Sequence, residues 1–138
     1  MSVIVIANGE VAVRLGTAIE AQDKQVTFIA PTSHAAEELA FAFPRALVVH
    51  GDGRDPGVLR QARVEATGAV LSATSDDATN LSISLLAREA FSVPTVAAVV
   101  NHPHNTRTFE ALGIPAVSCT QIVADALMST LATRSVKG

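Results

Sequence analysis

A glycine turn with the spacing of a phosphate-binding loop follows the first apolar segment of the chain. Segment 2–6 is mostly apolar, and the residues after it read ANGEVA. This spacing is close to the pattern G-x-G-x-x-G/A, in which backbone N–H groups at a helix start bind a dinucleotide pyrophosphate. The central glycine and the last small residue are present, whereas alanine replaces the first glycine. We therefore predict an altered phosphate-binding turn with contacts from Ala7, Asn8, Gly9, Glu10 and Val11.

Three later turns also follow apolar segments and carry small or polar side chains. They are Ala30-Pro31-Thr32, Gly51-Asp52-Gly53 and Ala73-Thr74-Ser75. In an open parallel sheet, ligands bind beyond the carboxyl ends of the strands, near the point where the strand order reverses. If the apolar segments are parallel strands, all four turns surround one crevice, and we predict that they contact the ligand there.

The positions of these turns depend on elements that alternate along the whole chain. Short apolar runs predict strands at 2–6, 26–29, 46–49, 69–72, 95–100 and 115–117. Helical spacing and end signals predict helices at 9–21, from 32 or 33 to 43, from 56, from 74 or 75, at 103–113 and at 121–133. This alternation predicts an α/β fold with a Rossmann-like, doubly wound parallel six-stranded sheet. No linker divides the chain, so we predict a single domain over residues 1–138.

Helical spacing also predicts which side chains face the sheet. Val11, Leu15 and Ile19 share one side of the first helix. The second helix is predicted to bury a set of apolar side chains: Ala36, Leu39, Ala40 and Phe43.

Residues at two further helix starts receive structural interpretations. Thr74 or Ser75 is predicted to cap the fourth helix, because a hydroxyl oxygen can accept a hydrogen bond from the first turn. Asp76 and Asp77 would then lie in solvent, stabilised by the helix dipole, and a metal-binding pair is the alternative. Cys119, the single cysteine, is predicted to be a small buried apolar residue without a catalytic role.

Composition limits the classes of function. The chain is 49% hydrophobic, but no apolar run approaches the roughly 18 residues of a membrane span. The N-terminus lacks a secretory pattern, and one cysteine suits a reducing compartment, so we predict a cytoplasmic protein without direct membrane insertion. The net charge is −3, basic residues are scattered, and Trp and Tyr are absent, which argues against nucleic-acid binding.

Three segments in register carry a family resemblance. Residues 51–59 read GDGRDPGVL, residues 74–81 read TSDDATNL, and NHP at 101–103 precedes FEALG at 109–113. Together they resemble the N-terminal RCK (KTN, TrkA-N type) domain of potassium channel and potassium uptake regulators. The resemblance implies a cytoplasmic, non-enzymatic gating domain that senses NAD(H) or an adenine nucleotide (ATP, ADP or AMP). It also implies a homodimer or larger ring through the last helix, 119–134, and a membrane potassium channel or transporter subunit as partner.

Four positions depart from the family pattern. Ala7 replaces a glycine, Glu10 an arginine, Ala30 an acidic residue and Val99 an arginine. Because a carboxylate that accepts ribose hydroxyls contributes about 1.5–3 kcal/mol, Ala30 alone predicts roughly ten- to hundredfold weaker binding. One hypothesis is that Glu10 folds back over the helix start and occupies the anion site itself.

Two other functions fit the same sequence. One is a small NAD(P)-dependent oxidoreductase, although the chain has no tyrosine as proton donor and no Cys–His pair placed for chemistry. The other is a dimerisation module whose ligand site has decayed. A nucleotide-induced shift in melting temperature separates the sensing domain from this last alternative.

Overall fold

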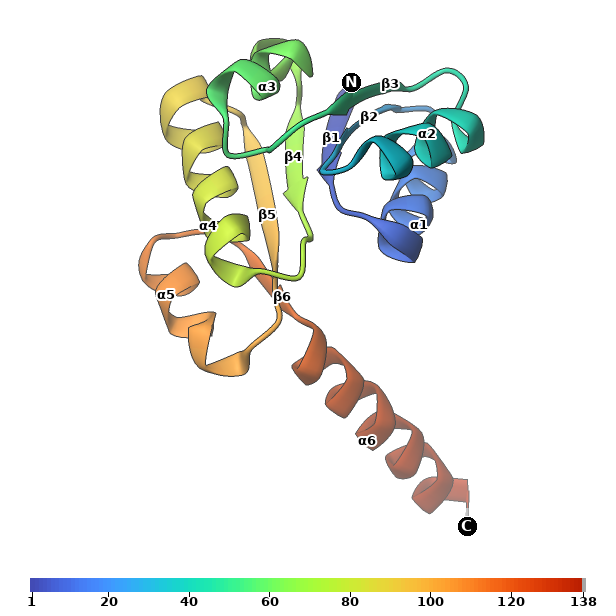
Figure 1. Cartoon of the computed structure of the whole chain (residues 1–138). Coiled ribbons are helices and arrows are strands. Elements are labelled where there is room, and N and C mark those ends of the chain that lie inside the picture. Colours follow the sequence, from blue (N-terminus) through green and yellow to red (C-terminus); the bar gives the residue numbers. More distant parts are fainter. Residues whose placement is uncertain (138) are drawn as a thin grey trace.

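Strands and helices alternate through the computed structural model, which describes residues 1–137 (Figure 1). The strands are β1 (Ser2–Ile6), β2 (Gln25–Ala30), β3 (Leu47–His50), β4 (Ala69–Ser72), β5 (Thr95–Val100) and β6 (Ala116–Ser118). The α-helices are α1 (Gly9–Glu20), α2 (Ser33–Ala42), α3 (Pro56–Gln61), α4 (Asp77–Leu85), α5 (Thr106–Ala111) and α6 (Cys119–Lys137). Two short 3-10 helices, η1 (Val64–Ala66) and η3 (Pro103–Asn105), and a π-helical segment that continues α4, η2 (Leu86–Ala90), are also present.

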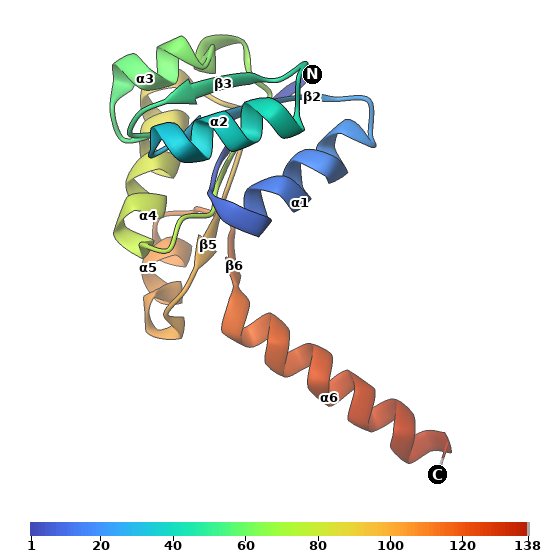
Figure 2. The same ribbon diagram turned by 45° about the vertical axis from the view of Figure 1, so that its right-hand side comes forward.

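The strands form one parallel sheet in the order β3-β2-β1-β4-β5-β6. The strand order reverses between β1 and β4, whose register pairs Ile6 with Ser72 at their carboxyl ends. Helices α1 and α2 lie on one face of the sheet, and α3, α4 and α5 lie on the other (Figures 1 and 2). The predicted six-stranded, doubly wound parallel sheet is therefore confirmed.

Two apolar cores separate the sheet from its helices. Val3 and Val5 of β1 pack toward α1 and α2, while Ile4 and Ile6 of the same strand pack toward α3 and α4. A parallel strand covered on both faces needs apolar residues at consecutive positions, which is why β1 reads as an unbroken apolar run.

The apolar faces of the first two helices differ in part from the prediction. On α1 the residues buried against the sheet are Ala12, Gly16 and Ile19, whereas Val11 is 49% exposed. The small residues Ala12 and Gly16 face the sheet and let α1 approach it closely. Val11 therefore lies outside the contact between α1 and the sheet. On α2, Leu39 and Phe43 are buried as predicted, but Ala40 is exposed.

Three local features were not predicted correctly. Helix α4 is capped by the Asp76 side chain, which accepts from the Thr79 N–H, and not by Thr74 or Ser75. The predicted helix 103–113 is divided into η3 and α5, and Gly113 follows it with a left-handed φ of +71°. Cys119 is exposed, because α6 begins there and leaves the sheet.

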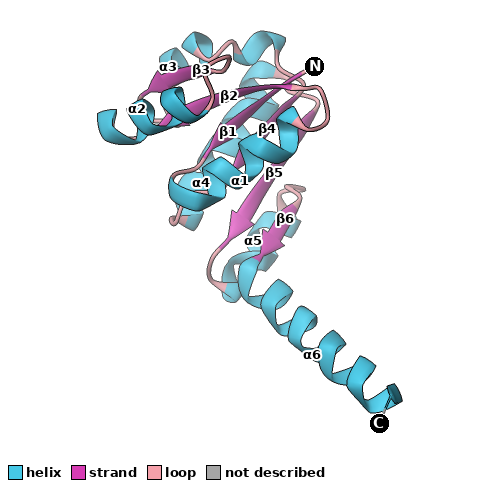
Figure 3. Ribbon diagram, turned by 90° about the vertical axis from the view of Figure 1, so that its right-hand side faces the viewer, coloured by secondary structure: helices cyan, strands magenta, loops and turns pink. Residues whose placement is uncertain are grey.

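Helix α6 projects from the end of β6 away from the rest of the chain (Figures 2 and 3). Its large apolar side chains are 53–66% exposed: Ile122, Val123, Leu127, Met128 and Leu131. The helix therefore does not pack on its own sheet.

Replacing Gly16 with alanine tests the close approach of α1. A Cβ atom at Gly16 would lie 2.6 Å from Cζ of Phe28 and 2.7 Å from Cζ of Phe43. Both rings are buried, so Gly16→Ala should lower the free energy of unfolding by about 1–3 kcal/mol in urea denaturation. Gly57→Ala is the control, because its nearest neighbour is the Asp55 Oδ1 atom at 3.3 Å. Equal stability of the Gly16→Ala variant and the unmodified chain would contradict this packing.

Candidate functional site

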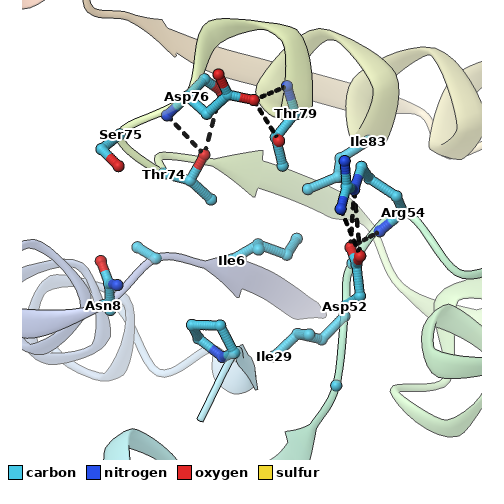
Figure 4. A pocket seen from close by; sticks show the side chains of 14 residues that line it. Ile6, Asn8, Ile29, Asp52, Arg54, Thr74, Ser75, Asp76, Thr79 and Ile83 are labelled. Atoms are coloured by element: carbon cyan, nitrogen blue, oxygen red, sulfur yellow. Dashed lines mark hydrogen bonds and ion pairs between the residues drawn. The ribbon is translucent and has the colours of Figure 1, made fainter.

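A cleft of about 370 Å³ opens at the carboxyl edge of the sheet, where the strand order reverses (Figure 4). The turns after β1, β2, β3 and β4 form its walls together with the start of α4. The residues that line it are Ile6, Ala7, Asn8, Ile29, Pro31, Gly51, Asp52, Gly53, Arg54, Thr74, Ser75, Asp76, Thr79 and Ile83. All four predicted turns thus reach one cleft, although not every predicted residue lines it.

Three predicted contact residues have structural roles beside the cleft. Ala30 is fully buried in the core under α1 and α2. Thr32 caps α2, and its hydroxyl oxygen accepts from the Ala35 N–H at 3.1 Å. The Ala73 N–H donates to the Ile6 carbonyl at 2.8 Å, which continues the pairing of β1 and β4 beyond the strands.

Three further predicted residues lie at the start of α1 and do not line the cleft. Gly9 has a φ of +62°, a left-handed conformation that favours glycine, and it begins the helix. Val11 is exposed. The Glu10 carboxylate lies 3.8 Å from Nε of Arg14, and both side chains are more than four-fifths exposed. The hypothesis that Glu10 fills the anion site is therefore wrong in this structure.

The N-terminus of α1 differs from those of the three helices that follow it. The side chains of Thr32, Asp55 and Asp76 each accept a hydrogen bond from the first turn of α2, α3 or α4. Asn8, the N-cap residue of α1, makes no such bond, although it lines the cleft. The first N–H groups of α1 are consequently left without a side-chain cap at the edge of the cleft, where an anion can bind them.

A buried amide holds the turn between β4 and α4. Asn80 is fully buried, and its Oδ1 atom accepts from Ser72 Oγ at 3.0 Å and from the Thr74 N–H at 2.9 Å. Its Nδ2 group donates to the carbonyls of Thr74 at 3.0 Å and Val99 at 2.9 Å. The Thr74 hydroxyl also lies 2.6 Å from Asn80 Oδ1, so that this wall of the cleft has a fixed shape.

Asp77 is buried and not solvated, contrary to the prediction. Its Oδ1 atom accepts from the Asn101 N–H at 2.6 Å and from Asn101 Nδ2 at 2.9 Å. Its Oδ2 atom accepts from the His102 N–H at 3.0 Å and from Asn105 Nδ2 at 2.8 Å. Burial raises the pKa of Asp77, but the hydrogen bonds from Asn101, Asn105 and His102 together outweigh it and lower the pKa to about 2.

Arg54 is the one basic residue among those that line the cleft. Its Nη2 group donates to Asp52 Oδ2 at 2.8 Å, and its Nε group lies 3.1 Å from Asp52 Oδ1. These bonds lower the pKa of Asp52, and Asp52 in turn raises the pKa of Arg54. The hydrogen bond from the Thr79 hydroxyl has the largest effect on Asp76 and lowers its pKa. The Thr79 N–H group and the charge of Arg54 lower this pKa further. The charged rim of the cleft therefore carries two carboxylates and one guanidinium.

An apolar floor lies below this rim. A Cβ atom at Gly53 would lie 3.0 Å from Ile83 Cδ1 and 3.3 Å from Cγ1 and Cγ2 of Ile6. Gly53 is buried and packs closely against these two isoleucines, and Ile29 lines the same cleft. These residues form a closely packed apolar floor beneath the cleft.

Sequence reasoning missed several residues that line the cleft: Ile6, Ile29, Arg54, Asp76, Thr79 and Ile83. Arg54 could have been found, because it lies inside the GDGRD segment. The three isoleucines look like ordinary core residues in the sequence. Only the fold distinguishes them, because it places Ile6 and Ile29 at the ends of β1 and β2 and Ile83 of α4 beside them.

The fold defines a Rossmann-like domain with a cleft at the point where the strand order reverses. A family model described as "TrkA-N domain" matches residues 3–120, and the chain belongs to this family. The Trk system potassium uptake protein TrkA of Streptomyces coelicolor is 33% identical over 133 residues, which are 95% of this chain and 58% of that relative. The chain thus spans little more than half the length of this relative.

Two solved structures have a similar fold. The NAD(P)-binding domain of an exopolyphosphatase-related protein from Archaeoglobus fulgidus is 27% identical, with a TM-score of 0.78, over 95% of this chain and 97% of that one. The Kef CTD of Shewanella denitrificans in AMP-bound form is 20% identical, with a TM-score of 0.80, over 98% of this chain and 88% of that one. Within residues 1–137, no helix is both long enough and apolar enough to cross a membrane.

The Asp77 carboxylate should make the chain sensitive to acid. Its pKa is about 2 in the folded chain and 3.8 ordinarily, so its contribution to stability is present above pH 4 and is lost as the pH falls toward 2. The difference corresponds to about 2 kcal/mol. Asp77→Asn should lower the free energy of unfolding at pH 7 by about 1–3 kcal/mol. The asparagine NH₂ group would face the N–H groups of Asn101, His102 and Asn105, which need an acceptor.

The measurement is urea denaturation between pH 7 and pH 2. Asp55→Asn is the matched control, since asparagine retains the oxygen that caps α3. If Asp77→Asn and the unmodified chain lose the same free energy of unfolding between pH 4 and pH 2, the Asp77 carboxylate does not cause the acid sensitivity.

Proposed function

We propose that the cleft binds an adenine nucleotide or NAD(H), and that the domain senses this ligand without changing it chemically. The observation that carries the proposal is the N-terminus of α1, which has no side-chain cap and lies at the edge of a cleft with an apolar floor. A phosphate bound at the N–H groups after Asn8 would place a flat base within reach of Gly53, Ile29 and Ile83.

Recognition by this cleft depends on shape and backbone groups more than on charged side chains. The wall at the end of β2 consists of Ile29 and Pro31, which offer no side-chain acceptor to ribose hydroxyls. The Glu10 carboxylate is solvated, so its repulsion of a phosphate at 4 Å is closer to about 1 kcal/mol than to the 4 kcal/mol of a partly buried pair. The site therefore suits nucleotide binding at a reduced affinity, mainly because Ile29 and Pro31 offer no acceptor to the ribose hydroxyls.

The ligand classes follow from the volume of the cleft and from the similar proteins. A volume of about 370 Å³ is at the small end of ligand sites, which favours a single nucleotide or one half of NAD(H). An NAD(P)-binding domain and an AMP-bound domain are among the similar structures. Both support an adenine-containing ligand for this chain.

The role that we propose is regulatory: a gating domain of a potassium transport system at the cytoplasmic side of the membrane. The match to the TrkA-N family and the similarity to a potassium uptake protein support it. The side chains that line the cleft are apolar residues, hydroxyls, one amide, two carboxylates and one guanidinium, a set suited to binding. In this role a membrane channel or transporter subunit is the partner.

We further propose that the segment 119–134 of α6 crosses to a second copy of the chain. The helix projects from the body, and five large apolar side chains on it are more than half exposed. An unpartnered apolar helix face of this kind is typical of a protein–protein contact. Burial in a homodimer, or in a larger ring, would remove this surface from water.

Gly53→Val tests the ligand site, because the larger side chain would displace Ile6 and Ile83 and change the floor of the cleft. We expect NAD⁺, NADH, AMP, ADP or ATP to raise the melting temperature of the unmodified chain, with and without Mg²⁺. In calorimetry, the variant should bind the nucleotide that raises the melting temperature at least about tenfold more weakly than the unmodified chain does. Gly57→Val is the control outside the cleft, and melting curves without ligand show that both variants fold.

Two results would contradict the proposed function. If no nucleotide changes the melting temperature, the chain is better described as a dimerisation module with a decayed ligand site. If the chain oxidises NADH with a carbonyl substrate, the oxidoreductase alternative is correct. In the source organism, the Gly53→Val allele should alter potassium uptake at low external potassium, whereas the Gly57→Val allele should not.

Leu127→Glu tests the role of α6. A charged side chain at this position would be buried in a helix–helix contact, so the variant should elute as a monomer in size-exclusion chromatography with light scattering, whereas the unmodified chain elutes as a dimer or larger ring. Ser129→Glu adds the same charge on the same helix and is the control. A monomeric unmodified chain would rule out assembly through α6 at the tested concentration.

A further inference from the structure

A groove with unpaired basic side chains lies at the edge of the sheet opposite the cleft. A cavity of about 410 Å³ at the start of β1, β2 and β3 is lined by residues that include Ser2, Gln25, Arg45 and Arg63. It adjoins a second cavity of about 480 Å³, which shares Gln25 and Arg45 and adds Glu20, Asp23 and Lys24.

Two arginines from different parts of the chain meet at the first of these cavities. Arg45 precedes β3, and Arg63 follows α3. Both are exposed, and neither forms an ion pair with any side chain that the structure describes. Other arginines of the chain are paired with carboxylates: Arg14, Arg54, Arg60 and Arg88. On a chain with a net charge of −3, two uncompensated guanidinium groups at one cavity produce a local positive potential.

The backbone of Arg63 adopts a conformation that is uncommon for residues other than glycine. Arg63 has a φ of +62° directly after the C-cap residue Ala62, a left-handed position that glycine favours. Hydrogen bonds hold this conformation on both sides: the Arg63 N–H donates to the Arg60 carbonyl at 2.9 Å, and the Ala66 N–H donates to the Arg63 carbonyl at 3.0 Å.

We propose that this groove binds the phosphoryl group of a small soluble anion. Two planar guanidinium groups can each donate a pair of parallel hydrogen bonds to phosphate oxygens, which makes a dianion the matching ligand. Glu20 and Asp23 in the adjoining cavity would repel an extended polyanion or a negatively charged membrane surface. The site is separate from the cleft and does not depend on nucleotide binding there.

The test is a titration with inorganic phosphate and with pyrophosphate at constant ionic strength, followed by ¹H–¹⁵N NMR. The amide signals of Gln25, Leu47 and Ala66 should shift with either anion. Arg63→Gly and Arg45→Gln should each weaken pyrophosphate binding by about ten- to hundredfold. Arg107→Gln removes another exposed arginine, located on α5 and without an ion pair among the described side chains, and should leave binding unchanged.

Arg63→Gly also separates lost binding from lost folding. Glycine relieves the left-handed strain, so the variant should melt at or above the temperature of the unmodified chain. Gly53→Val, which changes the floor of the cleft, should bind pyrophosphate in the groove normally, so failure of the nucleotide site does not imply failure of this one. Equal pyrophosphate affinity of Arg63→Gly and Arg107→Gln would overturn the proposal, as would shifts confined to Asn8 and Gly9. Binding to anionic lipid vesicles or to an acidic peptide, but to neither phosphate compound, would overturn it as well.

Discussion

The buried carboxylate of Asp77 is the interaction on which the geometry of the cleft depends. A buried charge without partners costs several kcal/mol, and here four donors from Asn101, His102 and Asn105 satisfy it. These donors lie beyond β5, so the start of α4 is tied to the next strand of the sheet. Asn80, one turn further along α4, fixes the turn after β4 in the same way. The wall formed by Thr74, Ser75 and Asp76 is rigid because both helix positions are held.

The opposite wall is arranged differently, and this contrast gives the cleft its chemistry. The start of α1 has no side-chain cap, and its backbone N–H groups are the main polar feature on that side. The Glu10 side chain extends along the helix toward Arg14, and its carboxylate is exposed to solvent. The floor is apolar, with Gly53 packed against Ile6 and Ile83. A rigid polar wall, an open helix terminus and an apolar floor together suit a nucleotide that is bound and released unchanged.

Much of the fold could be predicted because the central strands β1, β2 and β4 are covered on both faces. Consecutive apolar residues at 2–6 and 95–100 have few other interpretations, and the alternation with helices leaves one sheet architecture. The side of α1 that meets the sheet was less predictable. Spacing favoured Val11, but the close contact of Gly16 with Phe28 and Phe43 turns the smaller residues inward. Asp77 was misread for a related reason, since a helix-start carboxylate is usually solvated and its partners here are more than twenty residues away in sequence.

The sequence by itself determined the parallel sheet, the four turns at its carboxyl edge and the family of the domain. These features depend on local spacing and on motifs whose residues are each consecutive or nearly so in the chain. Only the tertiary structure decided which turn residues line the cleft, that Ala30 faces the core, that Asp77 is a buried anchor and that Arg45 and Arg63 meet at the far edge. Each of these depends on residues that are distant in sequence. The direction of a side chain and the partners of a charge are set by packing between elements, which local patterns do not encode.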